Sequence, residues 1–233
     1  MDNENRQVAG RTGLNAFLGK LYGFMAGAVA ISAIVAFLID TVFAKQVLPY
    51  LAQNNWVVWV LFIVQLALVF TTSMRADRSP ALTAMGLFVF AAIEGLFFST
   101  LLLVYTSQDI ASAFGSAAVV FVVLSVFGLN TKKDLSKFGR QAYAALIALI
   151  IVSLINLFLR SPMINFVFSI IGVVIFTVLT AWDTQRMKQL YFNAGGQINT
   201  TNLALVGAFQ LYLDFVNLFL QFLQIFGIGS QKD

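Results

Sequence analysis

Three carboxylates stand inside long apolar segments of this sequence: Glu94, Asp183 and Asp214. A charged group in the hydrocarbon core of a bilayer costs about 2.5–3.5 kcal/mol on insertion scales. Acids in such places are therefore candidates for binding or moving cations and protons. The chain has no His and no Cys, so disulfides, thiol catalysis and zinc sites built on those residues are excluded. Any metal bound here would be a hard cation held by oxygen.

Asp183 and Asp214 are related by the geometry of a helical hairpin. Two neighbouring apolar segments, 163–186 and 203–226, are joined by a polar loop. In an antiparallel pair, residues at equal depth sum to a constant, so Asp183 should face a position within one helical turn of Asp214. Two carboxylates this close in a poorly hydrated place cannot easily both ionise, and they titrate as a unit. The pair would supply a proton switch without histidine.

A second interpretation of these acids is separate pairing with basic residues. The basic residues available for this are Arg75, Arg78 and Arg186. The sequence alone favours neither arrangement, and one acid could use both in different states.

The last apolar segment carries a stripe of polar residues. Its members are Gln210, Asp214, Asn217, Gln221 and Gln224. Spacings of four and three residues place them on one helix face, over about 21 Å at 1.5 Å per residue. The stripe is either a set of hydrogen bonds between helices or a hydrated path, and the presence of an acid among four amides favours the path. The ion-pathway candidates are Glu94, Gln210, Asn217 and Gln221.

The composition and the apolar runs predict an all-α integral membrane protein. Apolar residues make up 60% of the chain and charged residues 10%, against about 25% charged in a soluble domain. Seven runs approach or exceed the length of about 20 residues that a membrane-spanning helix needs: 21–39, 56–74, 81–105, 110–129, 142–159, 163–186 and 203–226. A β-barrel would show shorter, alternating segments. We expect a leader at 1–20, one seven-helix domain at 21–228 with the polar last helix central, and a tail at 229–233.

Prolines and serines indicate where the helices begin. Pro80 and Pro162 stand at the starts of the third and sixth runs, where a missing N–H costs nothing. Ser79 and Ser161 precede them as expected N-caps. Pro49 is placed in the loop after the first run, so that no proline interrupts a span.

The distribution of basic residues predicts the orientation. With the N-terminus in the cytosol, eleven of the 14 Lys and Arg residues lie on the inside: Arg6, Arg11, Lys20, Arg75, Arg78, Lys132, Lys133, Lys137, Arg140, Arg186 and Lys188. Only Lys45, Arg160 and Lys232 lie outside. This is a strong positive-inside bias, and it supports an odd number of spans with the C-terminus outside.

Several function classes are disfavoured by what the sequence lacks. The net charge of +4 comes from loop residues, and no basic stripe is interleaved with stacking aromatics, so no nucleic-acid partner is expected. The sequence has no nucleophile elbow and no phosphate loop. It also lacks the Gly-x-Gly-Asp of intramembrane aspartyl proteases and a lysine in the last span for retinal. We therefore expect no enzyme and no resident cofactor.

Three segments in register resemble the Bax inhibitor-1 family, also called transmembrane Bax inhibitor motif proteins. They are Thr-Lys-Lys-Asp-Leu-Ser at 131–136 with Gly139, Thr-Ala-Trp-Asp-Thr-Gln at 180–185, and Leu-Tyr-Leu-Asp-Phe-Val-Asn-Leu-Phe at 211–219. The resemblance covers about residues 15–228, and the short leader and tight loops are similar to the bacterial branch. Trp182 stands where the family often has Tyr.

The resemblance implies a fold, an activity and site residues. It implies seven helices with the last one central, and a pH-sensitive calcium leak whose sensor is an aspartate pair, here Asp183 and Asp214. An arginine near the end of the second helix would latch the sixth-helix acid, which gives Arg75 or Arg78. Glu94 is similar to acids implicated in conduction. Calcium would be the permeant ion, held transiently by Asp183 and Asp214 with water completing its shell of 6–8 oxygens.

Two alternatives to a passive leak stay open. The first is a non-conducting interaction protein that modulates a membrane-bound protease or stress and cell-death regulators. The second is a proton-coupled transporter, although no inverted repeat or broken helix marks one. The partners expected in any case are the lipid bilayer, calcium ions and protons, and the oligomeric state is not predicted. The expected location is a bacterial inner membrane, with the endoplasmic reticulum as the second choice.

Overall fold

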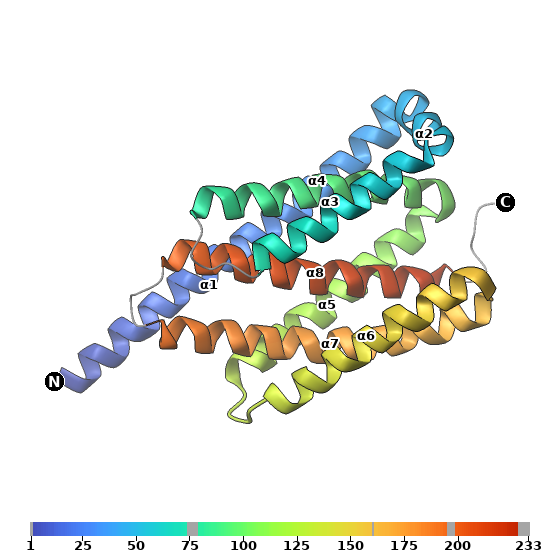
Figure 1. The fold of residues 1–233 in the computed structure, drawn as a ribbon. Coiled ribbons are helices and arrows are strands. Elements are labelled where there is room, and N and C mark those ends of the chain that lie inside the picture. Colours follow the sequence, from blue (N-terminus) through green and yellow to red (C-terminus); the bar gives the residue numbers. More distant parts are fainter. Residues whose placement is uncertain (1, 74–78, 160, 195–198, 228–233) are drawn as a thin grey trace. The chain divides into compact units, whose positions relative to one another are not determined.

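The computed structural model describes residues 2–73, 79–159, 161–194 and 199–227, and within these ranges it is built from helices without β-strands (Figure 1). The elements in chain order are α1 (Asp2–Leu38), the π-helix η1 (Ile39–Phe43), α2 (Ala44–Gln53), α3 (Asn55–Ser73), α4 (Pro80–Val104), α5 (Ser107–Asn130), α6 (Ser136–Leu159), α7 (Pro162–Asn193) and α8 (Thr200–Phe226).

Seven of these helical stretches are long and apolar enough to cross a membrane. The first span runs from Thr12 to Gln53 through α1, η1 and α2, and the other six fall one each on α3 to α8. Their best stretches have mean hydropathies between 1.7 and 2.4. The predicted all-α, seven-span fold class is confirmed. The orientation of the termini stays a prediction.

The predicted starts of α4 and α7 are confirmed by their first residues and caps. Pro80 and Pro162 are the first helical residues. The Ser79 hydroxyl accepts from the Leu82 N–H at 3.4 Å, and the Ser161 hydroxyl accepts from the N–H of Ile164 at 3.5 Å. Each serine thus satisfies one of the N–H groups that a helix start leaves without an intrahelical partner.

The placement of Pro49 in a loop was wrong. Pro49 lies inside α2, which continues from α1 through the wider turn of η1. A proline within a helix removes one i→i−4 hydrogen bond, here the one to the Lys45 carbonyl. The sequence around it keeps apolar residues at helical spacing (Val47, Leu48 and Leu51), and this pattern sustains the helix around the proline.

The chain packs as two compact units. The first contains Met1–Leu103 and Leu190–Tyr212, and the second contains Val104–Gln189 and Leu213–Asp233. The boundary crosses α7 near its end and α8 near its middle, so α8 contributes its first half to one unit and its second half to the other.

α8 is the most buried of the seven spans. In its most apolar 18-residue stretch, 78% of the residues are buried, against 11–33% in the other six spans. Leu211 and Leu218 are fully buried, and Asp214 on the polar stripe is only 5% exposed. This agrees with the prediction that the polar last helix is central.

Close contacts at glycines and aromatic rings hold each unit together. In the first unit, Phe90 of α4 packs edge-on against Phe209 and Tyr212 of α8, with centroid distances of 5.2 and 6.0 Å. In the second unit, Phe215 of α8 packs edge-on against Phe121 of α5 at 5.8 Å, and Gly128 of α5 lies directly against the Ala181 backbone of α7.

Candidate functional site: a buried aspartate pair

The structure brings Asp183 of α7 and Asp214 of α8 into contact. A side-chain hydrogen bond joins the two carboxyl groups. Asp183 is completely buried and Asp214 is 5% exposed, and both lie in the second unit. The contact has the register that the hairpin geometry predicts, because the short connection between Asn193 and Thr200 fixes which turns of α7 and α8 meet. We call these two residues the aspartate pair.

A hydrogen bond between two carboxyl groups needs a proton. Two carboxylates are acceptors only, so at least one member of the aspartate pair must be protonated in this arrangement. The second oxygen of Asp214, Oδ2, is buried without a hydrogen-bond partner among the described residues. An unpaired charge in such a place would be strongly destabilising. The hydrogen bond between the two carboxyl groups thus depends on a proton.

Helix α5 packs directly against the turn of α7 that carries Asp183. Gly128 allows the two backbones to approach closely at Ala181. The Thr184 hydroxyl lies 3.4 Å from that of Ser125. One turn earlier on α7, the hydroxyl of Thr180 donates to the Phe176 carbonyl at 2.8 Å. Small residues and satisfied hydroxyls thus fix the position of Asp183 from the α5 side.

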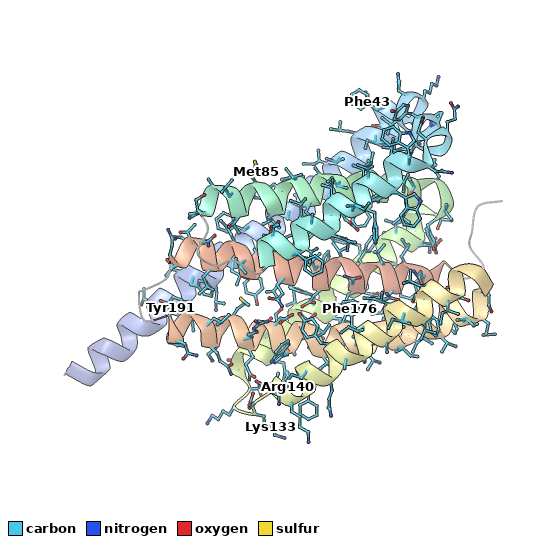
Figure 2. All side chains as sticks on the ribbon, in the orientation of Figure 1. Phe43, Met85, Lys133, Arg140, Phe176 and Tyr191 are labelled. Atoms are coloured by element: carbon cyan, nitrogen blue, oxygen red, sulfur yellow. The ribbon has the colours of Figure 1, made fainter. Side chains whose placement is uncertain are left out.

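Gln185 fastens the α5–α6 loop to α7 two residues after Asp183. Its Oε1 accepts from the Leu135 N–H at 2.9 Å, and its Nε2 donates to the Lys133 carbonyl at 2.9 Å. The ammonium group of Lys188 donates to the Leu129 carbonyl at 2.6 Å, near the end of α5. Figure 2 labels Lys133 and Arg140 on either side of the start of α6. The two bonds of Gln185 thus join the 180–185 segment to the 131–136 segment.

Asp134 in this loop caps the following helix. The backbone N–H of Ser136 donates to Asp134 Oδ1 at 2.9 Å. Hydrogen bonds from the Ser136 side chain and backbone hold the pKa of Asp134 below its ordinary value. The carboxylate thus stays ionised at the N-terminus of α6, where a negative charge is favoured.

Replacing Gln185 by Leu is expected to loosen this loop. The Leu135 N–H and Lys133 carbonyl would lose their partner, and each buried polar group left without one costs about 1–3 kcal/mol. Trypsin cleavage after the exposed Lys132 and Lys133 should become at least about tenfold faster, because cleavage follows the population of the open loop. Gln189→Leu, at an exposed position one turn further along α7, is the control. Equal cleavage rates in the two variants would contradict the role of Gln185.

The arginines predicted to pair with these acids are placed only in part. Arg186 is exposed and lies over the Trp182 ring, 5.4 Å from its centroid, while Trp182 packs edge-on against Tyr143 of α6. Gly139 of α6 leaves the room that this indole ring fills. Arg75 and Arg78 lie outside the described residues, so a latch to either of them stays a prediction.

Glu94 lies in the first unit, whereas the aspartate pair lies in the second. Its Oε2 accepts from Gln65 Nε2 of α3 at 2.6 Å. In the same unit, Ser32 of α1 lies 2.7 Å from the hydroxyl of Tyr212 of α8 and 2.8 Å from the Ala91 carbonyl of α4. Gln65, Ser32 and Tyr212 are all at most 7% exposed.

Sequence reasoning missed these three polar partners in the first unit. Gln65 could have been found, since an amide in the middle of an apolar span satisfies the criterion that singled out the stripe on α8. Ser32 and Tyr212 give no such signal, because both types are common in membrane-spanning helices.

The polar stripe of α8 divides between the two units. Gln210 belongs to the first unit and the rest to the second. Asn217 donates to the Leu213 carbonyl at 2.8 Å, and the Oε1 of Gln224 accepts from the Ser169 hydroxyl at 2.6 Å. Asn217 and Gln221 line a cleft of about 350 Å³ between α6, α7 and α8.

The described residues include no group of three or more acids that could hold a metal ion. The aspartate pair alone supplies two carboxyl groups, fewer than the 6–8 oxygens that calcium takes. Transient calcium binding by Asp183 and Asp214 therefore stays a prediction.

The fold and the site define a class: a helical membrane protein of seven spans whose last two helices share a buried, hydrogen-bonded carboxyl pair. Residues 14–231 match the family model described as inhibitor of apoptosis-promoting Bax1. The chain belongs to the Bax inhibitor-1 family.

Bacterial relatives match along nearly their whole length. The inner membrane protein YbhL of Escherichia coli K12 is 39% identical over 227 residues, covering 94% of each chain. The protein YrjE of Lactococcus lactis is 38% identical over 223 residues, covering 95% of this chain and 94% of YrjE. A membrane protein of Streptococcus pyogenes serotype M3 is 36% identical over 215 residues, covering 92% of this chain and 93% of that protein. The seven spans and the relation to YbhL support a multi-pass inner-membrane location.

Proposed function

We propose that this protein is a pH-sensitive calcium leak channel gated by the aspartate pair. The observation that carries the proposal is the hydrogen bond between Asp183 and Asp214 in a place with almost no solvent exposure. A buried pair that shares a proton has a charge that depends on pH, and a change of that charge changes the interaction between α7 and α8. Calcium is the proposed permeant ion on the strength of the family resemblance.

The gate has two states in this proposal. In the closed state the pair shares a proton and α8 packs against α7, α5 and α6 as described. When the charge of the pair changes, the hydrogen bond is lost and the balance shifts to an open state with a hydrated path along α8. Arg75 or Arg78 latches Asp183 in one of the states, and Glu94, Gln210, Asn217 and Gln221 line the path. The N-terminus faces the cytosol.

The proposal is tested by calcium flux through the purified protein in liposomes between pH 5 and 8. A hydrogen bond that involves a charged group contributes about 1.5–3 kcal/mol, so flux should change about 10- to 100-fold over this range. Runs with and without a proton gradient separate a passive leak from a proton-coupled transporter.

The absence of flux in several lipid compositions, with either sign of the calcium gradient, would contradict the channel. It would favour the alternative, a non-conducting protein that acts on a membrane protease or on stress and cell-death regulators. As a control for contaminating channels, liposomes are prepared with the same protein fraction from cells that do not express this protein.

A further inference from the structure

A cleft in the second unit lies within one helical turn of the aspartate pair. It opens between α6, α7 and the second half of α8, and its volume is about 350 Å³. Asn217, one turn beyond Asp214 on the same helix, lines it together with Gln221, one turn further on. The cleft is thus adjacent to the aspartate pair along the polar stripe.

The lining of the cleft combines polar and apolar groups. Asn217 and Gln221 of α8 and Ser153 of α6 supply the polar groups, while Ile150 and Leu154 of α6 are apolar and more than half exposed. Amides are unfavourable in a cleft that holds only lipid chains, because burying an amide without hydrogen bonds costs free energy. A bound water molecule makes 2–4 hydrogen bonds and occupies about 30 Å³. By volume, a cleft of this size has room for roughly ten water molecules.

A glycine on α7 lies beside the polar wall. A Cβ at Gly172 would collide with the carboxamide of Gln221, so Gln221 lies close to the α7 backbone and would have to shift if a larger residue stood there. Phe176, one turn further along α7, lines the cleft and is 3% exposed (labelled in Figure 2). It lies two turns from Asp183 on the same helix face.

We propose that this cleft is a water-filled vestibule that brings hydrated cations to within one helical turn of Asp214, with Phe176 as the barrier between them. As a route for calcium the vestibule rests on the proposed leak function. The filling of the cleft with water does not depend on the leak function. Water access and calcium flux are therefore measured separately.

The absence of native cysteine allows a direct test. Ser153→Cys places a thiol in the cleft, and Ile151→Cys places one on the same helix at similar depth, 54% exposed but outside the cleft. A positively charged methanethiosulfonate reagent reacts with the thiolate, which forms only in contact with water. In proteoliposomes at neutral pH, Ser153→Cys should react at least about tenfold faster than Ile151→Cys. Equal rates would overturn the proposal and favour a cleft filled by lipid chains.

A second position and a second readout keep the test decisive. If Ser153→Cys does not fold, as judged by gel filtration, Asn217→Cys replaces it with the same expectation. Labelling also fixes a positive charge in the vestibule, so calcium flux through Ser153→Cys should fall several-fold while flux through labelled Ile151→Cys is unchanged. Labelling without loss of calcium flux would overturn the cleft as a route for calcium but not its filling with water. Labelling of a protein that never conducts calcium would show a water-filled cleft and would contradict only the leak function.

Discussion

Replacing Asp214 by Asn is expected to remove most of the pH dependence of calcium flux between pH 5 and 8. Asparagine has nearly the shape of aspartic acid, and its amide can donate to Asp183 at every pH in this range. The contact between α7 and α8 would then no longer depend on a proton. The 10- to 100-fold variation expected for the unaltered protein should shrink to less than about threefold, since no hydrogen bond to a titrating group is made or lost.

The design of this experiment uses both members of the pair and an acid outside it. Asp183→Asn should have the same effect, and the double variant should add little to either single change, because residues in contact are not independent. Asp134→Asn, in the exposed α5–α6 loop, removes a carboxylate that is not part of the pair and should keep the normal pH profile. Normal pH profiles for both Asp183→Asn and Asp214→Asn would keep the channel but exclude the pair as its sensor.

Replacing Gly128 by Ala is expected to lower the stability of the second unit and to alter the gate. The added methyl group would overlap the Ala181 carbonyl oxygen on α7. This atom belongs to a helix backbone, so α5 and α7 must separate. Overpacking of this kind costs about 1–3 kcal/mol, which lowers the melting temperature by about 2–4 °C per kcal/mol in a chain of this size. Because Asp183 is two residues beyond Ala181, its hydrogen bond to Asp214 should also weaken.

The same helix offers a matched control for this prediction. A Cβ at Gly115 of α5 would meet no atom within 4 Å, so Gly115→Ala should leave the melting temperature equal or slightly raised, since alanine favours the helix over glycine. The measurement is thermal unfolding of both variants in one detergent, followed by gel filtration of the surviving fraction. A melting temperature for Gly128→Ala equal to that of Gly115→Ala would show that α5 and α7 are not held together at this point.

The spans and the aspartate pair could be predicted because each depends on few elements. The length and polarity of a membrane-spanning helix are local properties of the sequence. The contact between Asp183 and Asp214 involves two consecutive helices, and a short loop leaves little freedom in their register. Pro49 was misplaced because the first helix was expected to end with the apolar run at residue 39, whereas the apolar spacing on both sides of the proline sustains a helix.

The polar contacts of the first unit could not be predicted in the same way. Glu94 and Gln65 are 29 residues apart, and Ser32 and Tyr212 are 180 residues apart. Whether such residues meet depends on which helices are neighbours and on how each is rotated about its axis. Packing against all the other helices determines both, and no single segment of the sequence contains this information.

The extensive burial of α8 has a consequence for how the protein is made. Its best stretch has the lowest mean hydropathy of the seven spans, 1.7 against 1.8–2.4 for the others, and the whole helix carries Asp214 and five amides. Alone beside the translocon, such a segment would partition poorly into lipid. It emerges from the ribosome after the other six spans, so it can enter the bilayer along surfaces that they have already formed. A chain ending before Thr200 would leave those surfaces facing lipid, and we expect it to be removed by membrane quality-control proteases.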